Sequence, residues 1–249
     1  MISIGIKSAL KNMLIKVHLW KPVEFFIMCL SVILYKIAGI KLFEIDQQLY
    51  WSARSTAQEP PFQKEDPYYK YYDSCILDEI RDLKEIETIL EVGCYTGKML
   101  SLIQKEFYQR EITGCDIGSE QLLLCRNKTN LADVGLVQCD AAFLPFKNNT
   151  FDLVLTSTCL QHIPDSSITQ TIGELNRVGK RHLLLAECYI RHLPAGKKFQ
   201  LLSSNYYYMH EYEKLLRKTS FNKVKNYGMP DENNVNRYSI FVYKKNIEV

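Results

Sequence analysis

Residues 89–100 read Ile-Leu-Glu-Val-Gly-Cys-Tyr-Thr-Gly-Lys-Met-Leu, and this stretch decides the fold. A short apolar run ends in the acid Glu91, and a turn with two glycines, Gly93 and Gly97, leads into a helical pattern. A strand, a tight turn and a helix N-terminus in this order are typical of the ligand pocket of an α/β protein. Glycine lets the backbone approach a ligand because it has no Cβ. The stretch therefore predicts a nucleotide-sized pocket with a carboxylate at the strand end.

Segments of strand and helix character alternate after this turn. Strands are expected at 88–92, 111–115, 134–138, 151–156 and 182–187, with helices at 97–108, 119–128 and 166–177. This alternation predicts a parallel sheet with helices on both faces and right-handed connections. After a helical pattern at 211–218, two strand-like runs at 222–227 and 237–243 follow each other, which predicts an antiparallel hairpin at the sheet edge. The expected fold class is α/β, with a seven-stranded, mostly parallel sheet and an antiparallel last strand.

The overall composition is that of an ordinary globular protein. The chain has 249 residues, of which 47% are hydrophobic and 24% charged, with a formal net charge of +3. This composition excludes extensive disorder, and the charge is too small to indicate a nucleic-acid partner. The eight cysteines contain no C-x-x-C pair. We therefore expect no metal site, and reduced thiols in a cytoplasmic protein.

Residues 1–66 are predicted to form a basic, apolar, helical extension and linker, separate from a domain at 67–249. Residues 1–45 carry six lysines against two glutamates, and the apolar run at 25–35 is short of the roughly 20 residues that span a membrane. A signal peptide fits poorly. Three interpretations stay open: helices that cap the domain, an element resting on an anionic membrane surface, and a true span. Capping is preferred, so the expected location is cytoplasmic, with membrane attachment as the alternative.

Three acids stand at three successive predicted strand ends: Glu91, Asp116 and Asp140. In an open α/β sheet the ligand binds at these ends. Asp116 follows the first turn at the distance where a nucleotide fold places its ribose-binding acid, and Asp140 is placed to accept from an adenine amino group. A pyrophosphate site would need free N–H groups with no acid close by. The three acids therefore predict a pocket for an adenosine that carries positive charge.

The run of motifs resembles the class I S-adenosylmethionine-dependent methyltransferases of the type 11, or ubiquinone/menaquinone-biosynthesis, kind. The resemblance covers roughly residues 71–245. The matching segments are Glu-Val-Gly-Cys-x-x-Gly from Glu91, Asp116, Cys139-Asp140-Ala141 with Leu144-Pro145-Phe146, Phe151-Asp152-Leu153-Val154, and Leu160-Gln161-His162-Ile163-Pro164. The motifs stand in the family's order and spacing, which is more specific than any one of them.

The resemblance implies a Rossmann-like sheet and S-adenosylmethionine as cofactor. Nine residues would contact it: Glu91, Gly93, Cys94 and Gly97 at the aminocarboxypropyl end, Asp116 at the ribose, Ile117, Asp140 and Ala141 at the adenine, and Cys159 near the methionyl part. Tyr95 stands where the family often has glycine, and a tyrosine fits there with an ordinary φ and an outward side chain.

His162 is the candidate for acid–base work. Transfer to a hydroxyl requires removal of a proton, and histidine suits that task near neutral pH. The alternative is that His162 packs and hydrogen-bonds beneath the cofactor. Tyr206 and Tyr207 lie in the segment after the fifth predicted strand, which would face the acceptor. They are candidate substrate-binding residues, with ordinary packing as the alternative.

The expected activity is methyl transfer to a small-molecule, glycan or lipid-like acceptor, with O-methylation preferred. The alternative is a catalytically impaired cofactor-binding scaffold or membrane-associated partner protein, which the departure at Tyr95 motivates. A nicotinamide dehydrogenase is disfavoured because the turn lacks a full G-x-G-x-x-G. No motif names the acceptor or an oligomeric state.

Overall fold

The computed structural model describes Leu30, Trp51 and residues 66–189, 207–208, 210–230 and 235–246. Apart from Leu30 and Trp51, the predictions for residues 1–65 lie outside these residues. Within the described ranges, no helix is long and apolar enough to cross a membrane.

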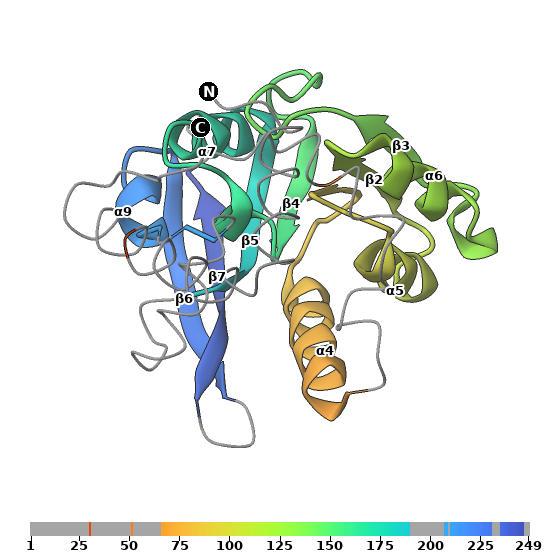
Figure 1. The fold of residues 1–249 in the computed structure, drawn as a ribbon, viewed down its shortest axis with the longest axis horizontal. Coiled ribbons are helices and arrows are strands. Elements are labelled where there is room, and N and C mark those ends of the chain that lie inside the picture. The colour runs from red at the N-terminus through yellow and green to blue at the C-terminus, as the bar shows by residue number, and fades with distance from the viewer. Residues whose placement is uncertain are drawn as a thin grey trace, which may run out of the picture.

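A seven-stranded sheet forms the centre of the molecule, with the strand order β3-β2-β1-β4-β5-β7-β6 (Figure 1). The strands are β1 Thr88–Val92, β2 Glu111–Asp116, β3 Gly135–Gln138, β4 Phe151–Ser157, β5 Gly179–Cys188, β6 Phe221–Pro230 and β7 Asn236–Lys245. Neighbours from β3 to β5 pair in parallel, whereas β7 runs antiparallel to both β5 and β6. The predicted fold class and edge hairpin are confirmed. The last strand, β7, returns between β5 and β6.

Helices cover the sheet, and those that follow β1 lie where the sequence pattern predicted them. The helices are α4 Pro67–Asp82, α5 Lys98–Glu106, α6 Ser119–Arg126, α7 Ile168–Val178 and α9 Tyr212–Leu216, with 3-10 turns η2 Thr129–Leu131 and η3 Leu160–His162. Helix α4 begins where its sequence dictates. Asp66 caps it by accepting the Tyr68 N–H at 2.8 Å, and Pro67 fills the first helical position, where a missing N–H costs nothing.

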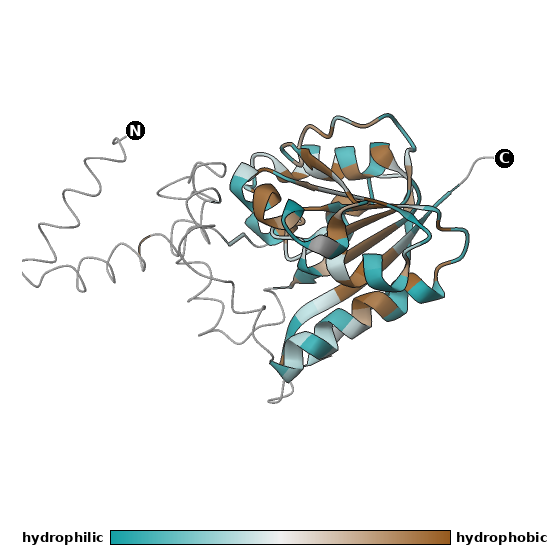
Figure 2. Cartoon of the chain, turned by 90° about the vertical axis from the view of Figure 1, so that its right-hand side faces the viewer, coloured by the Kyte–Doolittle hydropathy of each residue, from teal (hydrophilic) through white to brown (hydrophobic). Residues whose placement is uncertain are grey.

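The core has two layers, one on each face of the sheet, because successive strand residues point to opposite faces. Ile89 and Leu153 belong to the layer packed under α4 and α5, whereas Leu90 and Val154 belong to the layer under α7 and α9. Figure 2 shows this arrangement as apolar strands covered by helices with hydrophilic outer sides. The central strands are buried on both faces, and this explains their nearly continuous apolar sequences.

One buried carboxylate, Asp152, joins three strands at the edge of the sheet where they begin. Its Oδ2 accepts the N–H groups of Glu87 and Thr88 at 3.1 and 3.2 Å, and the Thr88 hydroxyl at 3.0 Å. Its Oδ1 pairs with Lys180 and Arg181 at 3.1 and 3.2 Å. Burial alone raises the pKa of Asp152, but these bonds outweigh it and hold the pKa below its ordinary value of 3.8.

Replacing Asp152 by Asn should lower the free energy of unfolding by about 1–3 kcal/mol at neutral pH, because buried donors lose their acceptor. The depressed pKa of Asp152 adds stability that is complete above pH 3.8 and is lost as pH falls through the lower folded-state pKa. Denaturant unfolding at a series of acidic pH values should therefore show a smaller loss for D152N than for the wild type. The exposed Asp133 supplies the control D133N, and equal acid slopes for D152N and wild type would contradict this account.

Candidate active site

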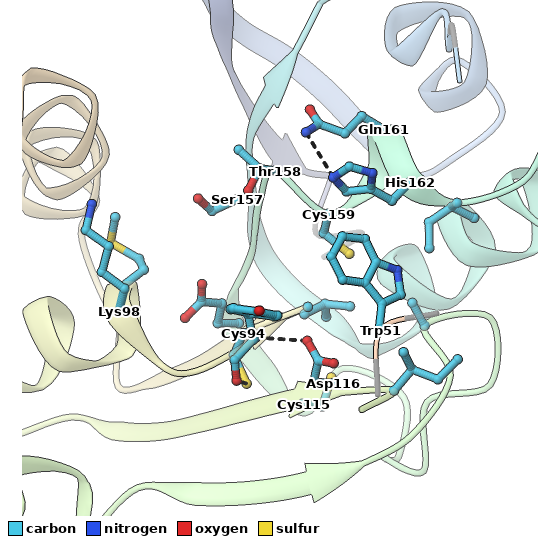
Figure 3. Close-up of a pocket in the computed structure, with 18 of the residues that line it drawn as sticks. Trp51, Cys94, Lys98, Cys115, Asp116, Ser157, Thr158, Cys159, Gln161 and His162 are labelled. Atoms are coloured by element: carbon cyan, nitrogen blue, oxygen red, sulfur yellow. Dashed lines mark hydrogen bonds between the residues drawn. The ribbon is translucent and has the colours of Figure 1, made fainter. Parts of the chain in front are cut away.

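A pocket of about 280 Å³ opens at the carboxyl ends of the strands (Figure 3). The strand order reverses between β1 and β4, and the connections leave these two strands on opposite sides of the sheet. A crevice forms at such a switch point because no connecting segment covers it. The ends of β1, β2 and β4 and the segment after β3 all line the pocket, and residues of α4 and Trp51 line it as well.

The turn between β1 and α5 adopts left-handed backbone at three residues. Gly93, Tyr95 and Gly97 have φ values of 76°, 49° and 74°. At Gly93 a Cβ would lie 2.4 Å from the Sγ atom of Cys159, so no larger residue fits. The expectation of an ordinary φ at Tyr95 is wrong. In this left-handed conformation the Tyr95 N–H donates to the carboxylate of Asp116 at 2.8 Å.

Asp116 ends β2 with its side chain buried at the pocket. Its Oδ2 accepts from Tyr95, and its Oδ1 accepts the Gly118 N–H at 2.9 Å. Burial raises the pKa of Asp116, and the backbone N–H groups reduce that rise. Since a carboxylate offers roughly four acceptor sites, each oxygen can still accept one bond from a ligand.

Glu91 is the most deeply buried of the pocket acids, with 3% of its surface exposed. Its Oε2 has no hydrogen-bond partner within the part of the chain that the structure describes. Burial, first of all, raises the pKa of Glu91 well above its ordinary range, and nearby groups that include Asp116 raise it further. Burying an acceptor without a hydrogen-bond partner costs free energy. We therefore expect a bound ligand to donate a hydrogen bond to this oxygen.

His162 lies between two aromatic rings at the other side of the pocket. Trp51 and Tyr207 meet its ring edge to face, with ring centroids 4.9 and 4.7 Å away. The side chain of Gln161 indicates the tautomer of this histidine in its neutral form. Its Oε1 accepts the Cys188 N–H at 2.8 Å, so its Nε2 faces the His162 Nε2 at 3.2 Å (Figure 3). The amide can only donate there, which places the proton of the neutral imidazole on Nδ1.

A comparison with protein families matches residues 89–182 to the model of a family described as a methyltransferase domain. The matched segment runs from β1 into β5 and includes every strand end at the pocket. Residues 89–182 are therefore similar to a methyltransferase domain.

Two curated relatives that match part of the chain are methyltransferases by name. The chain is 39% identical over 71 residues to the fatty-acid O-methyltransferase of Mycolicibacterium smegmatis, covering 28% of this chain and 26% of the relative. It is 36% identical over 93 residues to a demethylmenaquinone methyltransferase of Staphylococcus aureus, covering 36% and 38%. The chain thus spans about a quarter to two fifths of the length of these curated relatives.

Two solved structures share the fold at low sequence identity. Phosphoethanolamine N-methyltransferase 2 of Haemonchus contortus, in complex with S-adenosyl-L-methionine, superimposes with a TM-score of 0.61 at 17% identity, over 71% of this chain and 53% of its own. The geranyl diphosphate C-methyltransferase of Streptomyces coelicolor A3(2) gives a TM-score of 0.65 at 10% identity, over 81% and 98%.

The fold brings together almost all residues that the sequence predicted for the site. Eight of the nine predicted cofactor residues line the pocket, and these are Glu91, Gly93, Cys94, Asp116, Ile117, Asp140, Ala141 and Cys159. Gly97 does not line it and instead precedes the first residue of α5. Tyr207 lines the pocket, whereas Tyr206 lies outside the described residues. The individual roles of these residues stay predictions.

The chemistry of the pocket fits S-adenosylmethionine. Four carboxylates line it, those of Asp73, Glu91, Asp116 and Asp140, and in the described ranges Lys98 is the one lysine or arginine that does. The cofactor carries a sulfonium, an ammonium and one carboxylate, so a net negative wall suits it. The Glu91 Oε2 atom, which has no hydrogen-bond partner among the described residues, suits an ammonium as its donor. No group of three or more candidate metal ligands occurs among the described residues.

Trp51, Asp73, Lys98 and Gln161 are among the pocket residues that sequence reasoning missed. Lys98 directly follows the glycine turn, and this position was a usable signal. Trp51 and Asp73 precede β1 in the chain and belong to no motif. Gln161 was quoted within a motif, but its part in orienting His162 depends on β5, which is distant in sequence.

The left-handed Tyr95 makes a testable prediction about the turn. Tyr95→Gly and Tyr95→Ala remove the same ring contact with Trp51, whose centroid lies 6.2 Å away, but only glycine relieves the positive φ. After allowance for the greater freedom of glycine in the unfolded chain, the Gly variant should be more stable than the Ala variant by about 1 kcal/mol. Denaturant unfolding of both variants measures this difference. An Ala variant as stable as the Gly variant would disprove the strain.

Proposed function

We propose that the protein transfers a methyl group from S-adenosylmethionine to an oxygen atom of a small-molecule or lipid-like acceptor. The observation that carries this proposal is the division of the pocket into two kinds of wall. Carboxylates line the ends of β1, β2 and β3, and aromatic rings with apolar side chains line the side around His162. The first wall suits a cationic adenosyl compound, and the second suits an apolar acceptor.

The class of acceptor is argued from the apolar side of the pocket. Trp51, Tyr207, Ile163 and Pro164 supply apolar surface there, and no arginine from the described ranges lines the pocket to bind a phosphate. This favours an apolar or aromatic acceptor over a phosphorylated one. The names of two relatives, a fatty-acid O-methyltransferase and a demethylmenaquinone methyltransferase, support the same class. A glycan acceptor is less favoured, because sugars need several polar partners.

The sulfonium of the cofactor supplies an activated methyl group, so the chain has to orient the acceptor and deal with its proton. Orientation by itself supplies much of the rate in such a transfer. His162 is the candidate base at the acceptor side. Its lone pair at Nε2 faces Gln161, so it can accept a proton only when that bond opens. Kinetic measurements on His162 variants therefore test whether His162 removes the proton of the acceptor.

The proposal is tested by methyl transfer from radiolabelled S-adenosylmethionine with the full chain. The acceptors are a long-chain fatty acid, a demethylated quinol and a hydroxylated glycan. We expect label in the fatty acid or the quinol, released by base where an ester forms. Tight cofactor binding without transfer to any of these acceptors would instead support the scaffold function, which the strained turn at Tyr95 keeps as a second candidate.

A cytoplasmic location, with residues 1–45 as the membrane contact that delivers a lipid-like acceptor, belongs to the same proposal. The excess of lysine in this segment is the supporting observation. Sedimentation with anionic vesicles measures it, and equal sedimentation with neutral vesicles would refute the electrostatic contact.

Asp116→Ala should weaken the binding of S-adenosylmethionine by about 1–3 kcal/mol, because ligand hydroxyls lose their acceptor. Isothermal titration calorimetry measures the affinity, with the exposed Asp133→Ala as control. Asp116 also holds the N–H groups of Tyr95 and Gly118, so thermal unfolding is measured beside it. Undiminished affinity in a folded D116A variant would remove Asp116 from the cofactor site.

Two variants of His162 separate a base from a hydrogen-bond donor. If His162 removes the proton, His162→Ala and His162→Asn should both reduce turnover by roughly 10²-fold or more, because neither accepts a proton near neutral pH. An asparagine that retains turnover would assign a donor role, in agreement with the proton on Nδ1. Near-wild-type rates for both variants would restrict His162 to packing between Trp51 and Tyr207. Steady-state kinetics with saturating cofactor gives the comparison.

A further inference from the structure

Ser157 and Tyr72 form a hydrogen-bonded pair of hydroxyl groups in the pocket. Ser157 is the last residue of β4, and Tyr72 belongs to α4. Their oxygen atoms lie 2.8 Å apart, and both residues line the pocket. In Figure 3, Ser157 lies between Lys98 on one side and His162 on the other. The pair thus stands where the carboxylate-lined wall meets the aromatic wall proposed for the acceptor.

The direction of each hydrogen bond in this pair follows from the number of protons. The hydroxyl of Tyr72 also lies 2.8 Å from the carbonyl oxygen of Ala186, which can only accept. Burial, first of all, raises the pKa of Tyr72 well above its ordinary value of 10.0, so this hydroxyl keeps its single proton. That proton goes to Ala186, and the bond between the two hydroxyls therefore uses the proton of Ser157. With its proton held by Tyr72, Ser157 offers only lone pairs to a ligand.

The backbone segment after Ser157 has no N–H group left to bind an anion. All N–H groups of residues 158–163 already donate within the protein. The buried Glu187, for example, accepts the N–H of Cys159 at 3.1 Å. A carboxylate placed at Ser157 would therefore face lone pairs and receive no donor from this segment. Burying a charge without such partners is costly.

The charges of the pocket act in the same direction. Four carboxylates line it, and Lys98 is the one lysine or arginine from the described ranges that does. The Nζ atom of Lys98 is already paired with the Oδ2 of Asp73 at 2.5 Å. The carboxylates would repel a negatively charged acceptor. A neutral hydroxyl avoids this repulsion and supplies the donor that Ser157 lacks.

We propose that Ser157, positioned by Tyr72, accepts a hydrogen bond from the reacting hydroxyl of the acceptor, so that the site takes an alcohol or a phenol and rejects a carboxylate. This inference rests on the proposed function and names the acceptor class of the same pocket. Tyr72 acts through Ser157 and is a positioning residue.

The role of Ser157 in the transfer is to orient the acceptor. A lone pair of the acceptor oxygen forms the new bond to the methyl carbon, and the bond from that carbon to sulfur breaks with its electron pair left on sulfur. Ser157 does not take up the hydroxyl proton, because its own proton stays with Tyr72. The hydroxyl proton leaves to water, through His162 where that residue acts as the base.

The experiment compares acceptors that differ in the oxygen group alone. 2-Naphthol is paired with 2-naphthoate, and a long-chain alcohol with the fatty acid of the same length. With the full chain and radiolabelled S-adenosylmethionine, kcat/KM should be higher by roughly 10-fold or more for the hydroxyl member of each pair. Ser157→Ala should lower kcat/KM for the hydroxyl members by roughly 5- to 10-fold, as expected for one lost neutral hydrogen bond.

Tyr72→Phe tests the positioning role. This variant removes the oxygen that holds the proton of Ser157, so the serine becomes able to donate. The rate with the carboxylate members should rise, and the ratio of hydroxyl to carboxylate rates should fall by roughly 3- to 10-fold. A purely structural role would lower both rates alike. Tyr71→Phe removes an exposed hydroxyl from the same helix and should change neither rate.

Binding gives a readout that does not depend on turnover. Calorimetry on the full chain saturated with S-adenosylhomocysteine compares 2-naphthol with its methyl ether, which cannot donate a hydrogen bond. The wild type should bind 2-naphthol more tightly by roughly 5- to 10-fold, and Ser157→Ala should remove this difference. The same variant should bind S-adenosylhomocysteine as the wild type does.

The possible failures are distinguishable. Equal or faster transfer to the carboxylate members would overturn the inference and leave the proposed function standing. The same conclusion would follow if Ser157→Ala kept the difference between 2-naphthol and its ether, or if it lost affinity for S-adenosylhomocysteine, which would assign the serine to the cofactor. A wild-type protein that methylates none of the four acceptors would overturn the proposed function and this inference together.

Discussion

The site depends on the hydrogen bonds that the Asp116 carboxylate makes to two backbone N–H groups, those of Tyr95 and Gly118. The first bond ties the end of β2 to the turn after β1 and holds that turn in its left-handed form. A non-glycine residue in this region is strained by about 1–2 kcal/mol, so it persists only where other bonds support it. With the turn in place, Glu91 stays at the strand end and Lys98 starts α5 beside it. The same carboxylate is the predicted partner of the ribose, so structure and ligand binding share one group.

Charge is distributed unevenly around the pocket, and this distribution suits a zwitterionic, cationic ligand. Four carboxylates face a single lysine among the pocket residues that the structure describes. Burial raises the pKa of both Glu91 and Asp116, so the ionised form of each carboxylate is destabilised in the pocket. A cationic ligand would stabilise that ionised form. On the aromatic side, Glu187 is buried and its pKa is raised to about 7, chiefly by burial, while its Oε1 accepts the Cys159 N–H at 3.1 Å. This contact anchors the segment that carries His162.

Most of the fold could be predicted because the relevant signals are local. Apolar runs bounded by turns mark β1, β4 and β5, and the two runs after residue 220 mark the hairpin of β6 and β7. The acids Glu91, Asp116 and Asp140 stand at or just after the carboxyl ends of three strands, and they predicted where the pocket lies. Parallel strands bring their carboxyl ends to one edge of the sheet. The conformation of Tyr95 escaped prediction because its φ is set by a bond to Asp116, which lies 21 residues further along the chain.

The sequence by itself determined the fold class, the position of the pocket and the acids that line it, because hydrophobic periodicity and glycine turns act over a few residues. Only the tertiary structure decided which side chains meet across the pocket. Asp73 reaches Lys98, Gln161 orients His162, and Trp51 contacts the imidazole ring. Asp73 and Trp51 come from segments that precede β1, and Gln161 is fixed by β5, which is 27 residues away. Such contacts depend on packing between elements, and no local pattern in the chain records them.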